Sequence, residues 1–253
     1  MPESQKQKRR QTEAKKRLKQ SRKSTAKHGR PKVGYEGSYK EAKIVTFYDQ
    51  DKKGLHVAAT LKDSNAFGAM IRREASKVKL SQAEFSYSVA DGANWIAKQY
   101  RINLPILGAN VLDWYHFNEH VLQCSHDVYG EQSPKAKHWH KKMTELAWNQ
   151  GSLAMVKKLS DYERRNTGSK RVFFEKLRCY VQKRIDMTDY PDYRQQGYDC
   201  GSGPTESQCG SLTRRIKGAG MRWDVDNVGS MLALATLDHS SQWASYWKLQ
   251  RAA

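Results

Sequence analysis

The segment Phe85-Ser86-Tyr87-Ser88-Val89-Ala90-Asp91-Gly92 holds the pattern on which the predicted fold depends. Residues 85–90 predict a short strand that ends at the Asp-Gly pair, and residues 93–100 predict a helix that begins directly behind that pair. The pattern therefore predicts a carboxylate, that of Asp91, at the carboxyl end of a strand.

The elements on either side of this strand predict a mixed architecture. Residues 42–48 and 55–61 predict two strands joined by a turn at residues 49–54, and residues 65–79 have helical spacing. Residues 103–112 predict a further strand that reaches Asp113. The order strand, strand, helix, strand, helix, strand is typical of an α/β domain.

After Asp113 the predicted strands stop and helices follow. Glycine or proline separates four helical segments, at residues 114–128, 133–148, 151–165 and 169–184. A last apolar helix at residues 225–237 is expected to pack on the sheet.

Four regions follow from these patterns. They are a basic segment at residues 1–33, the amino-terminal part of the core at 34–113, a helical insertion at 114–200, and the carboxyl-terminal helices of the core at 201–253. Residues 1–33 contain 13 Lys or Arg and two Glu but only three larger apolar side chains. This composition predicts disorder in the free protein, with either nucleic-acid binding or solubility as its role.

The overall composition favours a polyanionic partner. The 253 residues include 45 Lys and Arg against 26 Asp and Glu, a formal net charge of +19, and 38% are hydrophobic. The hydrophobic content suffices for a core, and the charge favours nucleic acid through counterion release. Four separated cysteines without a CxxC pair predict a reducing, cytoplasmic compartment. No apolar run approaches the roughly 20 residues of a membrane-spanning helix, so no membrane partner is expected.

A second motif is Cys200-Gly201-Ser202-Gly203-Pro204-Thr205-Glu206-Ser207. Its Gly/Pro turn places Glu206 at the start of a predicted helix. Two-metal phosphodiester chemistry requires carboxylates from different elements, which predicts Asp91 and Glu206 as catalytic metal ligands. Taken singly, a strand-end Asp-Gly is also an ordinary turn, and a first-turn Glu is also favoured by the helix dipole.

Basic and aromatic residues follow Glu206 along the chain. Arg214, Arg215 and Lys217 form a basic stripe on the predicted helix, and Arg222 and Trp223 follow its glycine-rich end. Phosphate contact and base stacking are the DNA-binding roles predicted for them. For Lys217 the alternative is a last-turn cation stabilised by the helix carbonyls.

A polar group lies where the first helix of the insertion begins. Asp113, His116 and His120 share one helix face, and Cys124 or His126 would supply a fourth donor to a zinc site. The spacing fits no standard zinc finger. A hydrogen-bonding role at the edge of an active site is the favoured interpretation.

Together these motifs resemble the DDE transposases of bacterial insertion sequences, specifically the ISKra-like group related to Mutator-type elements. The resemblance rests on matching order and spacing in four segments and covers roughly residues 39–240. The four segments are residues 90–96, 112–117, 201–207 and 217–223.

The resemblance implies a ribonuclease-H-like (retroviral-integrase-like) fold with an all-helical insertion between the second and third acids. It implies two Mg²⁺ ions, with Mn²⁺ as a substitute, and DNA strand cleavage and transfer at transposon ends. It implies DNA and further copies of the chain as partners in synapsis, and a bacterial cytoplasmic location at the nucleoid. It also implies that Asp113 and His116 match the D/C-x2-H signature that supports the active site.

The first catalytic Asp of the family has no match in this sequence. That Asp stands in an Asp-Gly pair on a strand before residues 40–43, a place held here by the basic segment and residues 34–37. The resemblance thus implies that the first strand is missing, with Glu36, Asp49 and Asp51 as the alternative acids. Three functions remain open: a transposase or transposase fragment, a catalytically inactive nucleic-acid-binding remnant, and a basic RNA-associated protein.

Overall fold

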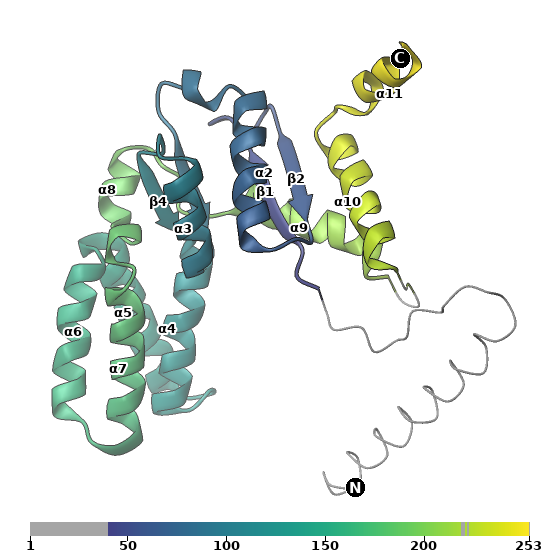
Figure 1. Ribbon diagram of the computed structural model, residues 1–253. Coiled ribbons are helices and arrows are strands. Elements are labelled where there is room, and N and C mark those ends of the chain that lie inside the picture. The colour runs from purple at the N-terminus through teal and green to yellow at the C-terminus, as the bar shows by residue number, and fades with distance from the viewer. Residues whose placement is uncertain (1–39, 219–220, 222, 253) are drawn as a thin grey trace, which may run out of the picture.

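The computed structural model describes residues 40–218, 221 and 223–252 and has an α/β architecture (Figure 1). The basic segment at residues 1–33 and the alternative acid Glu36 lie outside the described residues. Within the described part of the chain, no helix is both long and apolar enough to cross a membrane.

Four short strands form two separate two-stranded sheets in the described part of the chain. The first sheet is an antiparallel hairpin of β1 (Lys43–Phe47) and β2 (His56–Thr60), which confirms the predicted hairpin. The second sheet pairs β3 (Tyr87–Ala90) in parallel with β4 (Ala109–Leu112). The predicted strand at residues 103–112 is wrong in its first half, because a helix extends to Asn103 and β4 begins only at Ala109.

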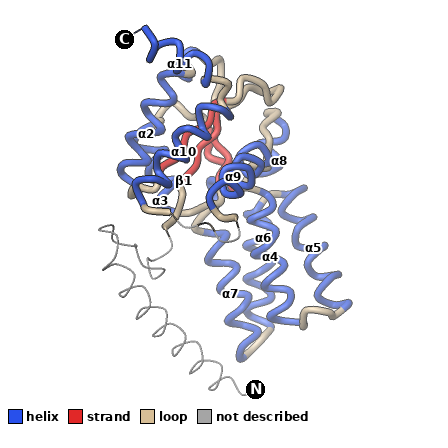
Figure 2. The backbone as a smooth tube through the Cα atoms, turned by 90° about the vertical axis from the view of Figure 1, so that its right-hand side faces the viewer, coloured by secondary structure: helices blue, strands red, loops and turns tan. Residues whose placement is uncertain are grey.

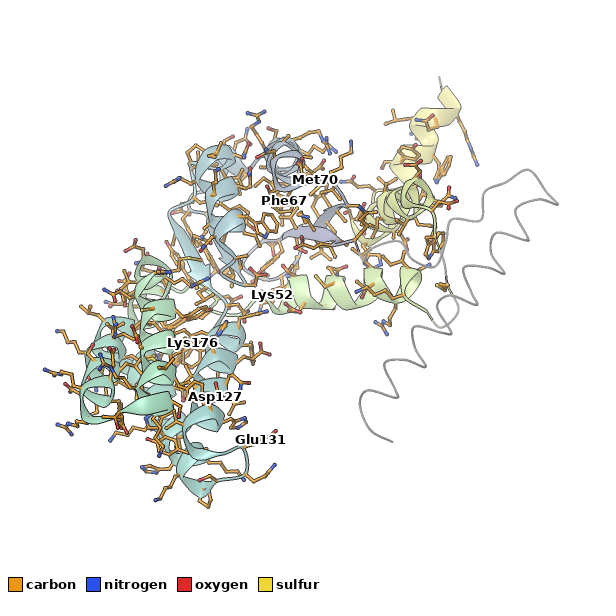
Figure 3. All side chains as sticks on the ribbon, turned by 60° about the horizontal axis from the view of Figure 1, so that its bottom comes forward. Lys52, Phe67, Met70, Asp127, Glu131 and Lys176 are labelled. Carbon is orange, nitrogen blue, oxygen red and sulfur yellow. The ribbon has the colours of Figure 1, made fainter. Side chains whose placement is uncertain are left out.

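Two helices pack together against one face of the hairpin. They are α2 (Ser64–Lys77) and α3 (Asn94–Asn103), and the short helix η1 (Leu80–Gln82) lies between them in sequence. Asp63 begins α2 as its N-cap, since its carboxylate accepts a hydrogen bond of 2.8 Å from the Ala66 N–H. Phe67 and Met70, labelled in Figure 3, belong to an apolar core that α2 shares with β1 and Leu104. This shared core covers one face of the hairpin and packs it against α2 and α3.

On the other face of the hairpin lie α9 (Gly203–Ile216) and α10 (Val225–His239). Val57 of β2 forms a buried cluster with Leu212 of α9 and Leu232 of α10. The prediction that the apolar helix at residues 225–237 packs on a sheet is therefore confirmed. The chain ends in α11 (Trp243–Ala252), which extends away from the strands (Figure 1).

The segment between β4 and α9 is helical and projects from the strands as a bundle (Figure 2). Its core is formed by large apolar side chains with no exposure, among them Phe117, Met143 and Phe174. The helices are α4 (Trp114–Tyr129), α5 (Pro134–Gln150), α6 (Ser152–Arg165), α7 (Gly168–Gln182), η2 (Ile185–Met187) and α8 (Tyr190–Gln195).

We predict that Leu212→Ala lowers the free energy of unfolding by about 2–5 kcal/mol, because it opens a cavity where α9 meets β2. Leu153→Ala is the matched control, since Leu153 on α6 is 58% exposed and its loss should cost less than about 0.5 kcal/mol. Urea unfolding followed by circular dichroism measures both values. Equal losses in the two variants would show that Leu212 does not fix α9 on the hairpin.

Candidate active site

The Asp113 carboxylate fastens the start of α9 to the end of β4. It accepts hydrogen bonds from the Ser202 N–H at 2.5 Å and from the Ser202 hydroxyl at 2.7 Å. Beside it, the Trp114 N–H donates to the Cys200 carbonyl at 2.7 Å. Because Ser202 is the N-cap of α9, these bonds fix where that helix begins.

Asp113 is also the N-cap of α4, where it accepts a hydrogen bond of 3.0 Å from the His116 N–H. The His116 ring Nδ1 lies 3.2 Å from the same carboxylate oxygen. Burial by itself would raise the pKa of Asp113, but the hydrogen bonds from His116 and Ser202 outweigh it and lower that pKa. The carboxylate is therefore held ionised and is fully occupied in joining three elements.

Asp91 stands exposed at the end of β3, in a turn with a defined shape. Its carboxylate accepts a hydrogen bond of 2.8 Å from the Ala93 N–H. Gly92 has a φ of 78°, and a side chain there would collide with Leu112. The Arg184 Nε donates to the Gly92 carbonyl at 3.0 Å, so the helical bundle holds this turn in place.

Glu206 lies exposed in the first turn of α9, and its N–H donates to the Ser202 carbonyl at 2.9 Å. Asp91 and Glu206 both line one cavity of about 780 Å³, which we term the central cavity. The walls of the central cavity come from β1, β3 and the first turns of α9, together with side chains of α2 and α3. The structure thus brings to one cavity two carboxylates that lie far apart in the sequence.

Tyrosines and a cysteine near these carboxylates are kept neutral. Burial raises the pKa of Tyr100 to about 12, and the nearby Asp91 carboxylate adds to the effect. Burial likewise raises the pKa of Tyr48 to about 12, with smaller contributions from Tyr87 and from two aspartates. Burial and then the charge of Glu206 raise the pKa of Cys209. These side chains offer hydroxyl and thiol groups, and no additional negative charge, to the central cavity.

The alternative acids in the hairpin turn have local partners. The Asp49 carboxylate accepts a hydrogen bond of 2.5 Å from the Lys53 N–H, and Asp51 pairs with the Lys53 amine at 3.4 Å. Asp49 lines the central cavity, as does Asp199, which pairs with Lys52 at 3.4 Å. Across the described residues, no cluster of three or more His, Cys, Asp or Glu is placed to hold a metal ion.

The histidine group at the start of α4 does not form a zinc site among the described residues. His120 packs its ring against Tyr180 at 3.8 Å between centroids, and burial followed by the charge of Arg184 lowers the pKa of His120. Cys124 is buried, and its thiol donates to the Phe173 carbonyl at 3.6 Å. Packing and hydrogen bonding are thus the roles these side chains have here.

The predicted DNA-binding residues lie at the far end of α9 from Glu206. Arg214, Arg215 and Lys217 are exposed, and Arg215 lies 4.0 Å from the Asp238 carboxylate. Trp223 is 37% exposed, and its indole N–H donates to the Ile216 carbonyl at 3.1 Å. Arg222 lies outside the described residues. The stripe therefore faces solvent, but α9 separates it from the two carboxylates.

Two residues that shape this site were not identified in the sequence. Ser202 lies inside the glycine-rich motif, and the signal that could have marked it is its place directly before a helix that begins with Gly203-Pro204. Arg184 stacks its guanidinium 4.1 Å from the Tyr180 ring centroid and donates to Gly92. No local pattern marks Arg184, because its partner Gly92 is distant in the sequence.

The chain matches no protein-family model, no curated protein and no solved structure with which it was compared. The functional argument therefore depends on the geometry of the central cavity and on the sequence motifs around it.

We predict that Asp113→Asn lowers the free energy of unfolding at pH 7 by about 1–3 kcal/mol, because the amide cannot accept all the hydrogen bonds that the carboxylate accepts. The folded-state pKa of Asp113 lies below its ordinary value of 3.8, so its stabilisation is complete above that pH and is lost as the pH falls below it. The difference between the parent chain and the variant should accordingly be constant from about pH 5 to 8 and narrow below about pH 4.

Urea unfolding across this pH range measures the difference. Asp127→Asn is the matched control on the same helix, since Asp127 is exposed and bonds only the Gln123 side chain among the described residues. A constant difference at all pH values would contradict the role of the ionised carboxylate.

Proposed function

We propose that this chain carries out the DNA chemistry of a DDE transposase, namely strand cleavage and transfer at the ends of an insertion sequence. The observation that carries the proposal is that Asp91 and Glu206 both line the central cavity, one from a strand end and one from a helix start. Phosphodiester chemistry of this kind needs carboxylates that converge from separate elements.

The donor chemistry of the central cavity suits Mg²⁺. Carboxylate oxygens are the hard ligands that Mg²⁺ prefers, and Mg²⁺ is commonly bound by one or two carboxylates together with substrate phosphates. Asp91 and Glu206 are the residues that would hold such an ion, with Mn²⁺ as its substitute. The bound ion supplies charge neutralisation for the attacking and leaving oxygens of the phosphodiester.

The chain's own residues have defined parts in this proposal. Arg184 and Gly92 hold the turn that presents Asp91, and the Asp113–Ser202 bonds set the position of Glu206. Both carboxylates are exposed within a cavity, so a DNA phosphate can approach them from solvent.

The arrangement of elements supports a ribonuclease-H-like core as part of the same proposal. The central cavity lies between β1 of the hairpin and β3 of the second sheet, and α2 and α9 pack on opposite faces of the hairpin. An all-helical segment separates Asp113 from Glu206. Both features agree with the expectation drawn from the transposase resemblance.

DNA is the proposed partner because of charge. The net charge of +19 attracts a polyanion, and exposed Arg214, Arg215 and Lys217 offer phosphate contacts. Additional copies of the chain in synapsis and a location at the bacterial nucleoid belong to the same proposal.

A second candidate function is DNA binding without catalysis. It is favoured by one observation, that several carboxylates line the central cavity but no three potential metal ligands among the described residues are placed to hold one ion. With two ligands alone, an ion is weakly held and cleavage by this chain on its own is expected to be slow. Metal binding separates the two candidates, since the non-catalytic alternative requires none.

We predict that deleting residues 1–33 flattens the dependence of DNA affinity on salt, because this segment contributes 13 of the 45 Lys and Arg. Each lost phosphate contact should reduce the slope of log affinity against log salt by about 0.9. Arg214→Gln combined with Arg215→Gln should reduce it by no more than about 1.8. Fluorescence anisotropy with a labelled duplex, from about 50 to 200 mM salt, measures the slope.

The matched control for the deletion replaces its Lys and Arg with Gln at constant length. It should reproduce the flattened slope if charge is the cause. An unchanged slope in both variants would show that residues 1–33 take no part in DNA binding.

We predict that Asp91→Asn and Glu206→Gln each weaken Mn²⁺ binding by at least about tenfold. Loss of a residue that merely hydrogen-bonds a metal ligand typically lowers metal affinity by about tenfold to a hundredfold, and loss of a direct ligand should lower it by no less. The double variant should lose the site. Titration followed by electron paramagnetic resonance of free Mn²⁺ measures the affinity.

Glu131→Gln is the matched control, because Glu131 is exposed at the far end of the helical bundle (Figure 3). Its Mn²⁺ affinity should equal that of the parent chain. If Asp91→Asn and Glu206→Gln also leave the affinity unchanged, the two carboxylates hold no metal and the non-catalytic candidate is favoured.

A further inference from the structure

A second cavity lies at the end of the helical bundle that is far from the strands. It has a volume of about 410 Å³, and we term it the distal cavity. Its walls come from the end of α4, the first half of α5 and one side chain of α6. Glu131, in the loop between α4 and α5, marks this end of the bundle (Figure 3). No residue lines both cavities, so the distal cavity is separate from the site of Asp91 and Glu206.

Three aromatic side chains form walls of the distal cavity. The ring centroid of Trp139 lies 6.2 Å from that of Tyr129 and 5.9 Å from that of Tyr162, at interplanar angles of 50° and 66°. The two tyrosines are only partly buried, so they offer ring surface to a planar aromatic ligand. Burial, followed by the nearby Tyr162 and Cys124, raises the pKa of Tyr129, which keeps its hydroxyl neutral.

The other side chains that line the distal cavity are mainly basic. They include Lys135, His138 and Lys142, and no acidic side chain among the described residues lines it. Acidic side chains of α5 and α6 have basic partners elsewhere, in the pairs Lys141–Glu145, Arg164–Asp161 and Arg178–Glu163. These acids therefore do not neutralise the positive charge at the cavity.

Two further lysines lie over the aromatic walls. The Lys170 amine is 5.8 Å from the ring centroid of Tyr129, and the Lys158 amine is 5.8 Å from that of Tyr162. Each lies within reach of a cation–π contact. Positive charge thus surrounds the rings as well as the opening between them.

The beginning of α5 adds to this positive potential. This helix has 17 residues, and its N-cap Ser133 accepts a hydrogen bond of 3.2 Å from the Lys135 N–H. Pro134 and Lys135, in the first turn, both line the distal cavity. The amino end of a helix favours a nearby anion, so it acts in the same direction as the basic side chains.

A buried donor on the cavity wall is an independent observation. Trp139 is 4% exposed, and its indole N–H has no hydrogen-bond partner among the described residues. Buried polar groups are satisfied in most folded proteins, so this N–H calls for an acceptor. A flat ligand with acceptor atoms on its ring would supply one.

These features together select one class of ligand. The volume lies at the small end of the range of about 300–1,000 Å³ found for small-molecule pockets. The occupant must combine an aromatic ring, acceptor atoms on that ring and a compact negative charge. A nucleotide combines all three, because its base stacks on aromatic side chains. Its terminal phosphate carries a charge of about −1.5 to −2 at pH 7, more than the single charge of a phosphodiester, which suits a cluster of cations.

We propose that the distal cavity binds a free nucleoside 5′-monophosphate. Its base lies against Tyr129 and Tyr162 and offers an acceptor to the Trp139 indole N–H. Its phosphate is held by Lys135 and Lys142 at the beginning of α5. The inference is independent of the proposed DNA chemistry, because none of these residues lines the central cavity.

The test uses the full chain in EDTA, with adenosine 5′-monophosphate (AMP) as the probe. Isothermal titration calorimetry at about 150 mM salt should show one saturable site, since this salt screens non-specific attraction to a basic chain. Ribose 5-phosphate keeps the phosphate without the base, and adenosine keeps the base without the phosphate. Each should bind at least about tenfold more weakly than AMP, because stacking and charge both contribute.

The Trp139 indole N–H provides a readout at the site itself. The chain has seven tryptophans, so ¹⁵N-correlated NMR shows seven indole signals, and Trp139→Phe identifies one of them by its loss. AMP should move the Trp139 signal downfield, as expected for a new hydrogen bond. Ribose 5-phosphate should leave that signal in place, because it has no base to accept the bond.

A matched pair of double variants tests the phosphate contacts. Lys135→Gln with Lys142→Gln removes two lysines that line the distal cavity, and Lys137→Gln with Lys141→Gln removes two exposed lysines of α5 that do not. The first should weaken AMP binding by about fivefold or more, and the second by less than about twofold. Both variants lower the net charge equally, so only contact at the cavity separates them.

A second pair of variants tests the stacking surface. Tyr129→Leu removes a ring and should weaken the binding of AMP but not that of ribose 5-phosphate. Tyr129→Phe keeps the ring and should bind AMP nearly as the parent chain does. If Tyr129→Leu fails to fold, the comparison of AMP with ribose 5-phosphate still decides the question on the unaltered chain.

Three results would overturn the inference. One is equal binding of AMP and ribose 5-phosphate, which would show that the base is not recognised. Another is equal loss of AMP affinity in the two double variants, which would reduce the binding to general charge attraction. The third is no AMP binding together with tight binding of a single-stranded oligonucleotide that Lys135→Gln with Lys142→Gln weakens, which would make a nucleic-acid strand the ligand. Since EDTA removes metal, none of these results depends on Asp91 or Glu206 as metal ligands.

Discussion

The hydrogen bonds between the Asp113 carboxylate and Ser202 are the constraint on which the rest of the site depends. Asp113 directly follows β4, is the N-cap of α4 and bonds Ser202, the N-cap of α9. One buried side chain therefore fixes the second sheet, the helical bundle and the helix of Glu206 relative to one another. Its lowered pKa reflects this position, because the folded state stabilises the charged form through several donors. Arg184 makes the complementary connection, since it reaches from the end of the bundle to the turn that presents Asp91. The helical bundle thereby holds both carboxylates at the central cavity although it contributes neither.

The whole chain and the central cavity carry charge of opposite sign. The chain is strongly basic, yet the central cavity is bordered by six acidic side chains and two lysines. A phosphate drawn to the protein by its exterior would be repelled at the cavity itself unless a cation lies between them. Divalent metal ions are often the largest local charges at phosphate sites and reverse this repulsion. The acidic cavity is therefore consistent with metal-assisted phosphodiester chemistry and is difficult to reconcile with direct phosphate binding at Asp91 and Glu206.

The sequence predicts those parts of the fold that local periodicity determines. The hairpin, α2, and the helices that begin at Trp114, Pro134, Ser152 and Gly168 follow from spacing and from Gly or Pro boundaries. The strand predicted at residues 103–112 is too long, because no local signal in this part of the sequence marks where α3 ends, at Asn103, and where β4 begins, at Ala109. The short α8 and the terminal α11 were not predicted. The contacts of Ser202 and Arg184 could not be predicted either, since each partner lies far away in the sequence and is brought near only by packing. For the same reason the motifs mark Asp91 and Glu206 as acids of interest, but only the fold shows that they line one cavity.

The two short sheets show why the central cavity matters for stability as well as for chemistry. A two-stranded sheet is at best marginally stable by itself, so β1–β2 and β3–β4 depend on the helices that cover them. The apolar core around Phe67 and Leu104 covers one face of the hairpin, and among the described residues no strand lies between β1 and β3. Any ligand that occupies the cavity in the folded state alone must stabilise that state, by about 2.7 kcal/mol at a hundred times its dissociation constant. Asp91 directly follows β3, so a ligand that stabilises β3 also stabilises the turn that presents Asp91.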